Sequence, residues 1–189
     1  MPRRFQRQRQ RQRQRQSGLS LIELLVCLAI TGILLSVVLP SMNGWMQRLR
    51  LQSAADLLRA DLQEARSLAI RQQSNVQVHL EWDDSGTCFI VHDGTAGACQ
   101  CAADHQAQCT GSSRALRTQW LSRNQQIKVT SNAGEIRFEA GQGAVTPSAT
   151  IVLSDEHDHV IHAVISGAGR TRLCAQDTRF GGLPLCSVN

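Results

Sequence analysis

The chain has 189 residues, a length that suits one compact domain with appendages and excludes two full globular domains. Its formal net charge is +5, with 20 basic residues against 15 acidic ones. Seven of the arginines lie before Ser17, and without them 13 basic residues face 15 acidic ones. The net charge of the rest is therefore −2, and bulk basicity gives no reason to assign nucleic-acid binding to it.

The first 16 residues are mostly alternating Arg and Gln, and no large apolar residue follows Phe5 until Leu19. Such a segment cannot bury a core, and its place before an apolar stretch predicts a cytoplasmic leader over residues 1–18. A nucleic-acid-binding arm is the alternative. From Leu19 to Leu39 the chain is almost wholly apolar, which predicts a single transmembrane and assembly helix over residues 19–39 that stays in the mature protein.

Glu23 lies inside this apolar stretch, where an ionisable group costs several kcal/mol unless it finds a partner. The segment from Ser17 to Glu23 resembles the processing site of type IV pilins and pseudopilins. The resemblance implies that a prepilin peptidase cleaves after Gly18 and methylates Leu19. It also implies that Glu23 pairs with the N-terminal amine of a neighbouring subunit during filament assembly.

The chain has seven cysteines, and Cys27 lies in the apolar stretch. The other six lie in the polar part: Cys88, Cys99, Cys101, Cys109, Cys174 and Cys186. An even set behind an exported span predicts up to three disulfides, with 15 possible pairings. Cys174 and Cys186, which flank a Gly-rich loop, are the favoured pair. A zinc site made by three of the cysteines at 99–109 is the alternative, although a Cys-x-Cys spacing is tight for shared tetrahedral ligation.

After Pro40 the pattern remains helical, and residues 40–73 are predicted to continue the helix as an amphipathic segment. Its apolar stripe consists of Leu51, Ala54, Leu58, Leu62, Ala65 and Ala69, and charged residues such as Asp61 and Arg66 fill the other faces. From Asn75 the period changes to two, which predicts strands at 76–80, 89–91, 126–130, 135–140, 150–153 and 160–165. The fold class is therefore α+β, with a β domain over 74–165 and a Gly- and Arg-bearing tail over 166–189.

This order of elements resembles the GspH/FimT family of minor pilins and pseudopilins from Gly18 to about Cys174. The matching segments are Glu64–Ile70 at the helix end, Ile136–Phe138 before a Gly-rich turn, and Gly169–Arg172. The resemblance implies a pilin-like fold, a long N-terminal helix packed on antiparallel sheets with disulfides. It also implies a single pass through the inner membrane, a periplasmic C-terminal domain, and partners that are other pilins or pseudopilins in a filament. Residues 93–113 do not match and are interpreted as a Cys-containing insertion or loop.

Charge is segregated in the mature part of the chain. Residues 75–111 contain five carboxylates and no Lys or Arg, so that face should repel polyanions. The tail contains Arg170, Arg172 and Arg179 against only Asp177. By composition alone it is a solvated surface loop, but Gly-rich, Arg-bearing loops also let side chains and backbone N–H groups approach phosphates.

The Gly-Arg-x-Arg sequence at 169–172 resembles the C-terminal DNA-binding motif of FimT-type minor pilins, which serve DNA uptake in natural transformation. The resemblance implies that Arg170 and Arg172 contact phosphates and that Gly169 sets the turn. Arg179, further along the positive tail, is predicted as an additional DNA-binding residue of smaller effect. A GspH-like minor pseudopilin, a structural part of the type II secretion system, is the alternative function.

Four residues, His157, Asp158, His159 and His162, suggest a metal cluster, but in a strand 157 and 159 share one face and 162 falls on the other. An exposed turn followed by a strand is the favoured interpretation, with no metal site and no cofactor. The sequence offers no nucleophile motif or other catalytic constellation. We therefore do not expect an enzyme.

Overall fold

A computed structural model describes residues 20–83, 85–178 and 180–186, with the backbone alone described at 37–41 and 43. The predicted leader and the predicted site residues Gly18, Leu19 and Arg179 lie outside these residues. The chain divides into two compact units, one ending at Met42 and the other beginning at Asn43. Helix α1 (Leu21–Gln72) runs through both units, and the strands of the described residues belong to the second.

Helix α1 begins at a residue suited to cap it. The backbone N–H of Glu23 donates to Oγ of Ser20 at 3.2 Å, and the Glu23 carboxylate lies in the first turn, where the helix dipole favours a negative charge. The helix continues through Pro40 without interruption. Among the described residues, however, no helix is both long enough and apolar enough to cross a membrane.

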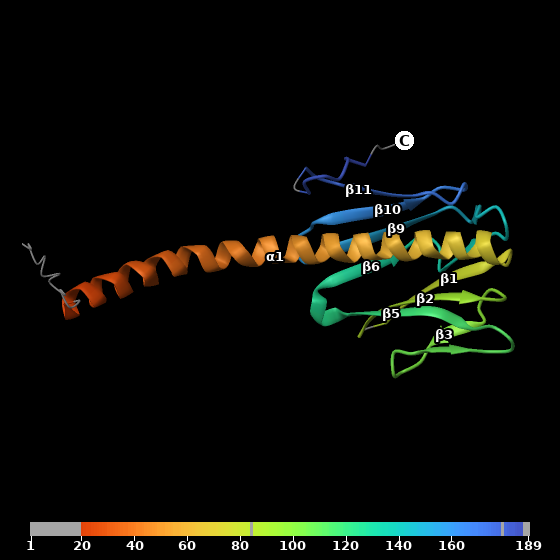
Figure 1. Ribbon diagram of the computed structural model, residues 1–189, viewed down its shortest axis with the longest axis horizontal. Coiled ribbons are helices and arrows are strands. Elements are labelled where there is room, and N and C mark those ends of the chain that lie inside the picture. Colours follow the sequence, from red (N-terminus) through yellow and green to blue (C-terminus); the bar gives the residue numbers. More distant parts are fainter. Residues whose placement is uncertain (1–19, 84, 179, 187–189) are drawn as a thin grey trace, which may run out of the picture. The chain divides into compact units, whose positions relative to one another are not determined.

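From residue 43 on, α1 lies across both sheets of the second unit (Figure 1). The apolar stripe of this helix segment is buried in one core with side chains of the strands, and Leu51, Leu62 and Ala69 are fully buried. Ala55 is also fully buried, whereas the predicted Ala54 is only partly so. Removal of these apolar side chains from water, at about 25 cal/mol per Å², holds the helix to the sheets.

The strands form two antiparallel sheets and a separate hairpin (Figure 1). The first sheet, in the order β5-β2-β1-β7-β8, contains β1 (Val76–Trp82), β2 (Gly86–Asp93), β5 (Ala115–Ser122), β7 (Glu135–Phe138) and β8 (Val145–Thr146). The second, in the order β11-β10-β9-β6, contains β6 (Ile127–Ser131), β9 (Ala149–Asp155), β10 (Val160–Ile165) and β11 (Thr171–Ala175). The hairpin is β3 (Cys99–Cys101) with β4 (Ala107–Cys109), and a short 3-10 helix, η1 (Arg123–Gln125), precedes β6.

The predicted α+β class, a long helix on antiparallel sheets with disulfides, is confirmed. Two details differ. Residues 93–113, interpreted as an insertion or loop, contain the β3–β4 hairpin. The second sheet also extends past residue 165 into the predicted tail, because Thr171, Leu173 and Ala175 are buried on one face of β11. Glycines before this strand and charged residues on its outer face concealed its alternation.

Three disulfides connect the six cysteines of the second unit. Cys99 and Cys109 face each other across the β3–β4 hairpin. The bond between Cys88 and Cys101 ties the hairpin to β2. Cys174 and Cys186, the pair favoured from the sequence, join β11 to the C-terminal segment. The alternative zinc site would use Cys99, Cys101 and Cys109 as ligands. Because all three form disulfides, they have no free thiolate to bind a metal.

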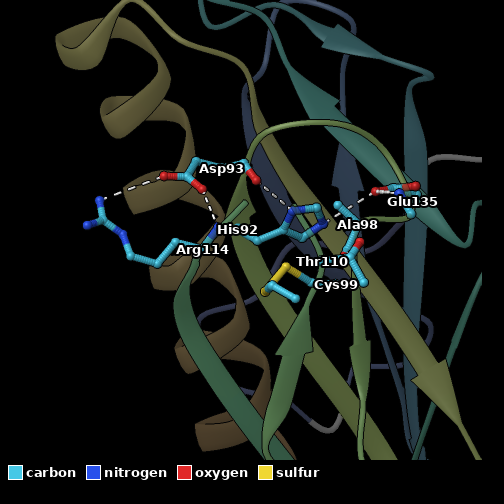
Figure 2. Close-up of a disulfide and its surroundings, with 9 residues drawn as sticks. His92, Asp93, Ala98, Cys99, Thr110, Arg114 and Glu135 are labelled. Atoms are coloured by element: carbon cyan, nitrogen blue, oxygen red, sulfur yellow. Dashed lines mark hydrogen bonds and ion pairs between the residues drawn. A yellow bond between two sulfur atoms is a disulfide. The ribbon is translucent and has the colours of Figure 1, made fainter. Parts of the chain in front are cut away.

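The hairpin also rests on polar contacts around Cys99 (Figure 2). Nδ1 of the fully buried His92 lies 3.0 Å from the Asp93 carbonyl oxygen, and Nε2 lies 3.5 Å from Oε1 of Glu135. The same Glu135 oxygen accepts the backbone N–H of Gly97 at 3.0 Å. These contacts, with the two disulfides, fix the hairpin against β1, β2 and β7.

Asp61 is a charged residue of α1 that the sequence placed on an outer face, but only 1% of it is exposed. Nε of Arg117, on β5, lies 2.9 Å from its Oδ1, and Nη1 of Arg117 lies 3.3 Å from Oε2 of Glu64. Burial raises the pKa of Asp61, the Arg117 charge works against this rise, and Glu64 adds to it. The ion pair with the Arg117 guanidinium is the reason that Asp61 can lie on the covered face of the helix.

The expected exposed turn before a strand is present, since residues 156–158 are exposed ahead of β10, but His159 at the end of this turn is buried. Nδ1 of His159 lies 2.7 Å from Oδ2 of Asp155, and the backbone N–H groups of His157 and His159 donate to its Oδ1. Burial works to raise the pKa of Asp155, but these hydrogen bonds outweigh it and hold that pKa below its usual value. No group of three potential metal ligands occurs among the described residues.

Candidate nucleic-acid interface

The predicted motif forms the turn that connects β10 to β11. The backbone N–H of Gly169 donates to the Ser166 carbonyl at 2.7 Å, and the Ser166 N–H donates to the Arg170 carbonyl at 3.1 Å. Arg170 and Arg172 are exposed, whereas Thr171 between them is buried. Alternation along the strand therefore directs both guanidinium groups outward from the same face.

Gly169 can hardly be replaced in this turn. Its φ is +74°, in the left-handed region that disfavours other residues. A Cβ at this position would overlap the carbonyl oxygen of Gly143 and lie 2.8 Å from Nε of Arg66. The predicted role of Gly169 thus has two physical reasons, the backbone conformation and the close approach of a second turn.

Three segments far apart in the sequence meet at this place. Nε of Arg66, near the end of α1, donates to the carbonyl oxygen of Gly143 in the turn between β7 and β8 at 3.2 Å. The Val145 N–H donates to the Gly167 carbonyl at 2.9 Å, which joins that turn to the β10–β11 turn. The turn carrying Arg170 is therefore held from two sides.

A groove of about 390 Å³ lies between the helix and the β10–β11 turn. Its lining consists of Gln63, Arg66, Ser67, Ile70, Gly169, Arg170, Thr171 and Arg172. Three guanidinium groups line it, and no carboxylate occurs in this lining as far as the chain is described. A charge set of this kind suits an anionic ligand.

None of the three arginines forms an ion pair with another described residue, whereas Arg117 and Arg114 are paired with carboxylates. A larger groove of about 810 Å³ lies beside β6, and its three carboxylates, Asp83, Asp155 and Glu156, outnumber its two cations, Arg123 and Lys128. Because these carboxylates would repel a polyanion, the smaller groove is the better candidate for nucleic acid.

The structure brings together Gly169, Arg170 and Arg172 of the predicted site, and the disulfide at Cys174 fixes the strand that follows. Glu23 belongs to the other unit of the chain. Arg66 was not predicted as a site residue. Its segment, Glu64–Ile70, carries the family resemblance alone, because no local pattern indicates that a helix residue lies beside a turn about a hundred positions later.

A helix laid on antiparallel sheets, with disulfides in the sheet region, is the architecture of type IV pilin-like proteins. Residues 54–174 match the family model described as Type II transport protein GspH, and the chain belongs to this family. Residues 13–39 match the prokaryotic N-terminal methylation motif, a range that includes Gly18, Leu19 and Glu23. The chain is thus a minor pilin or pseudopilin of the GspH/FimT type, a family of structural proteins.

Among solved structures, the chain is similar to the type IV minor pilin FimU of Pseudomonas aeruginosa, with 24% identity and a TM-score of 0.52 over 68% of this chain and 91% of that one. It is also similar to the minor pseudopilin EpsH of the type II secretion system of Vibrio cholerae, with 17% identity and a TM-score of 0.46 over 67% and 97%. No curated protein matches the chain. At these identities the likeness to FimU concerns the fold alone.

Proposed function

We propose that this chain is a minor type IV pilin that binds DNA without sequence preference and serves DNA uptake in natural transformation. The observation that carries the proposal is the pair of exposed, unpaired guanidinium groups of Arg170 and Arg172, directed outward from a rigid turn and lining a groove without described carboxylates. Arginine forks bind phosphate oxygens bidentately, and backbone phosphates do not distinguish sequences. Arg179, outside the described residues, adds a further cation to the same segment.

The expected binding is weak and strongly dependent on salt. The mature chain is slightly acidic overall, so its affinity for DNA comes from few cations. On duplex DNA, each neutralised phosphate contributes about 0.9 to the slope of log K against log salt concentration. Replacing Arg170 and Arg172 by Gln should therefore lower the slope by about 1.8 and the affinity by about 30-fold at 0.15 M salt.

This prediction is checked by titrating labelled duplex DNA with residues 19–189 in a nonionic detergent at several salt concentrations. The arginine-rich leader is left out because it would bind DNA itself. Lys128→Gln, which removes one exposed charge on β6, is the matched control and should keep the wild-type slope. Identical titrations for the wild type and the double Gln variant would show that Arg170 and Arg172 do not bind DNA.

For the N-terminal part, we propose that residues 1–18 are a leader that prepilin peptidase removes after Gly18, with methylation of Leu19. Residues 19–39 would then anchor the chain in the inner membrane by one pass, with the C-terminal domain in the periplasm until assembly into a pilus. The match to the methylation motif supports this. So do the exposed apolar side chains of α1, such as Leu21 and Ile22, which need lipid or neighbouring helices to cover them.

A GspH-like pseudopilin of the type II secretion system is the second candidate, favoured by the description of the matching family. Such a protein would assemble with other pseudopilins and would need no DNA-binding turn. Binding of DNA that disappears with Arg170 and Arg172 favours the pilus. Its absence, together with co-purification of secretion components, favours the pseudopilin.

A further inference from the structure

We propose that Arg66 is a third phosphate-binding residue and that the DNA backbone is held between α1 and the β10–β11 turn, an inference that rests on the proposed DNA binding. Gln63, Arg66, Ser67 and Ile70 follow one another at helical spacings of three, one and three, so that one stripe of α1 forms a wall of the groove. Arg170 and Arg172 form the wall opposite. The site is thus a two-walled groove and not a single loop.

The guanidinium of Arg66 is held in place by the fold. Nε donates to the Gly143 carbonyl, and a Cβ on Gly143 would lie 2.9 Å from Cγ of Arg66, which shows how closely the stem of the side chain packs there. A guanidinium has five N–H donors in a planar fork. One is used by Gly143, and the terminal Nη groups are left to bind a ligand in the groove.

The positive charge of Arg66 on α1 is not neutralised in the way that the charge of Arg117, which faces the same helix, is neutralised. Arg117 is neutralised by Asp61 and Glu64. Arg66 is partly buried, yet it has no carboxylate within 4.0 Å among the described residues. A partly desolvated cation gains most from an anion that approaches its remaining donors, and a phosphodiester supplies acceptor oxygens in the geometry of the fork.

The rest of the helix wall suits a nucleic-acid backbone. Gln63 supplies a neutral amide donor one turn before Arg66, whereas Ile70, 39% exposed, supplies an apolar surface one turn after it. Phosphate oxygens can accept from the amide, and the sugar can pack against the aliphatic side chain. The ligand class is therefore a polymer of phosphodiesters and not an isolated phosphate ion.

The experiment compares Arg66→Gln, Arg66→Lys and Arg137→Gln in the duplex titration of residues 19–189. Arg137 is exposed on β7, between Ile136 and Phe138, which face the core, and is the matched control for the loss of one charge. Arg66→Gln should lower the slope by about 0.9 and the affinity by about fivefold at 0.15 M salt. Arg66→Lys, which keeps the charge, and Arg137→Gln should keep the wild-type slope.

A wild-type slope for Arg66→Gln, with binding reduced in the Arg170 and Arg172 double variant, would overturn this inference and leave the proposed function standing. Equal binding by the wild type and the double variant would overturn both. If Arg66→Gln does not fold, the Nε–Hε signals of the wild-type arginines decide the question by NMR during addition of a short duplex. The Arg66 signal should move together with those of Arg170 and Arg172, and an unmoved Arg66 signal would contradict the proposal.

Discussion

Replacing Gly169 by Ala should lower the free energy of unfolding of the second unit by roughly 3 kcal/mol. Two costs add at this position. A residue other than Gly is strained at a φ of +74°, and the new methyl group would overlap the Gly143 carbonyl, which the Val145 and Arg66 contacts hold in place. Because backbone lies on both sides of the overlap, neither turn can move without losing hydrogen bonds.

The measurement is urea unfolding with the disulfides intact, and Gly167→Ala in the same turn is the matched control. Nothing lies within 4 Å of a Cβ at Gly167. Its replacement should change the free energy of unfolding by less than about 1 kcal/mol. Equal effects of the two substitutions would show that the contact between the two turns does not determine the conformation at residue 169.

Glu23→Val should reduce incorporation of the chain into filaments by about tenfold or more, because a charge among packed apolar helices is stabilised only by a partner of opposite sign. The side chain is exposed in the single chain and belongs to the first unit, so its loss should leave the β domain folded. The amount of the chain in sheared filaments, measured by immunoblotting, checks the prediction.

The control for this variant is a check that its N-terminus is still processed. Mass spectrometry of the membrane-extracted variant should still show a chain that begins at N-methylated Leu19, because Gly18 and the leader are unchanged. A processed variant that enters filaments as well as the wild type would remove the assembly role of Glu23. An unprocessed chain that retains Met1 would instead contradict the proposed cleavage.

Local patterns in the sequence were sufficient to predict the class of fold. Helical spacing from Leu51 to Ala69 and alternation from Val76 onward identify the helix and six strands, since both depend on neighbours in the chain. The same patterns failed for β5, which was not predicted, and for β11, where glycines and exposed arginines resemble a tail. They also failed for Asp61, whose burial depends on an arginine of β5 more than fifty residues later.

The candidate site could be predicted only in part for the same reason. The Gly-Arg-x-Arg sequence is contiguous and can be recognised by itself, so Gly169, Arg170 and Arg172 were identified in advance. The groove, however, is made by a helix and two turns that meet only in the folded chain. The contribution of Arg66 and the steric reason for Gly169 therefore required the structure.

The proposed binding of DNA by the β10–β11 turn for uptake is tested most directly by measuring the uptake of labelled DNA by living cells. Cells in which the double variant Arg170→Gln and Arg172→Gln replaces the wild-type protein should assemble it into pili at the normal level, because both side chains are exposed. Their DNA uptake should nevertheless fall by about tenfold or more, following the loss of two phosphate contacts. Normal uptake by cells whose pili contain the variant would contradict the account.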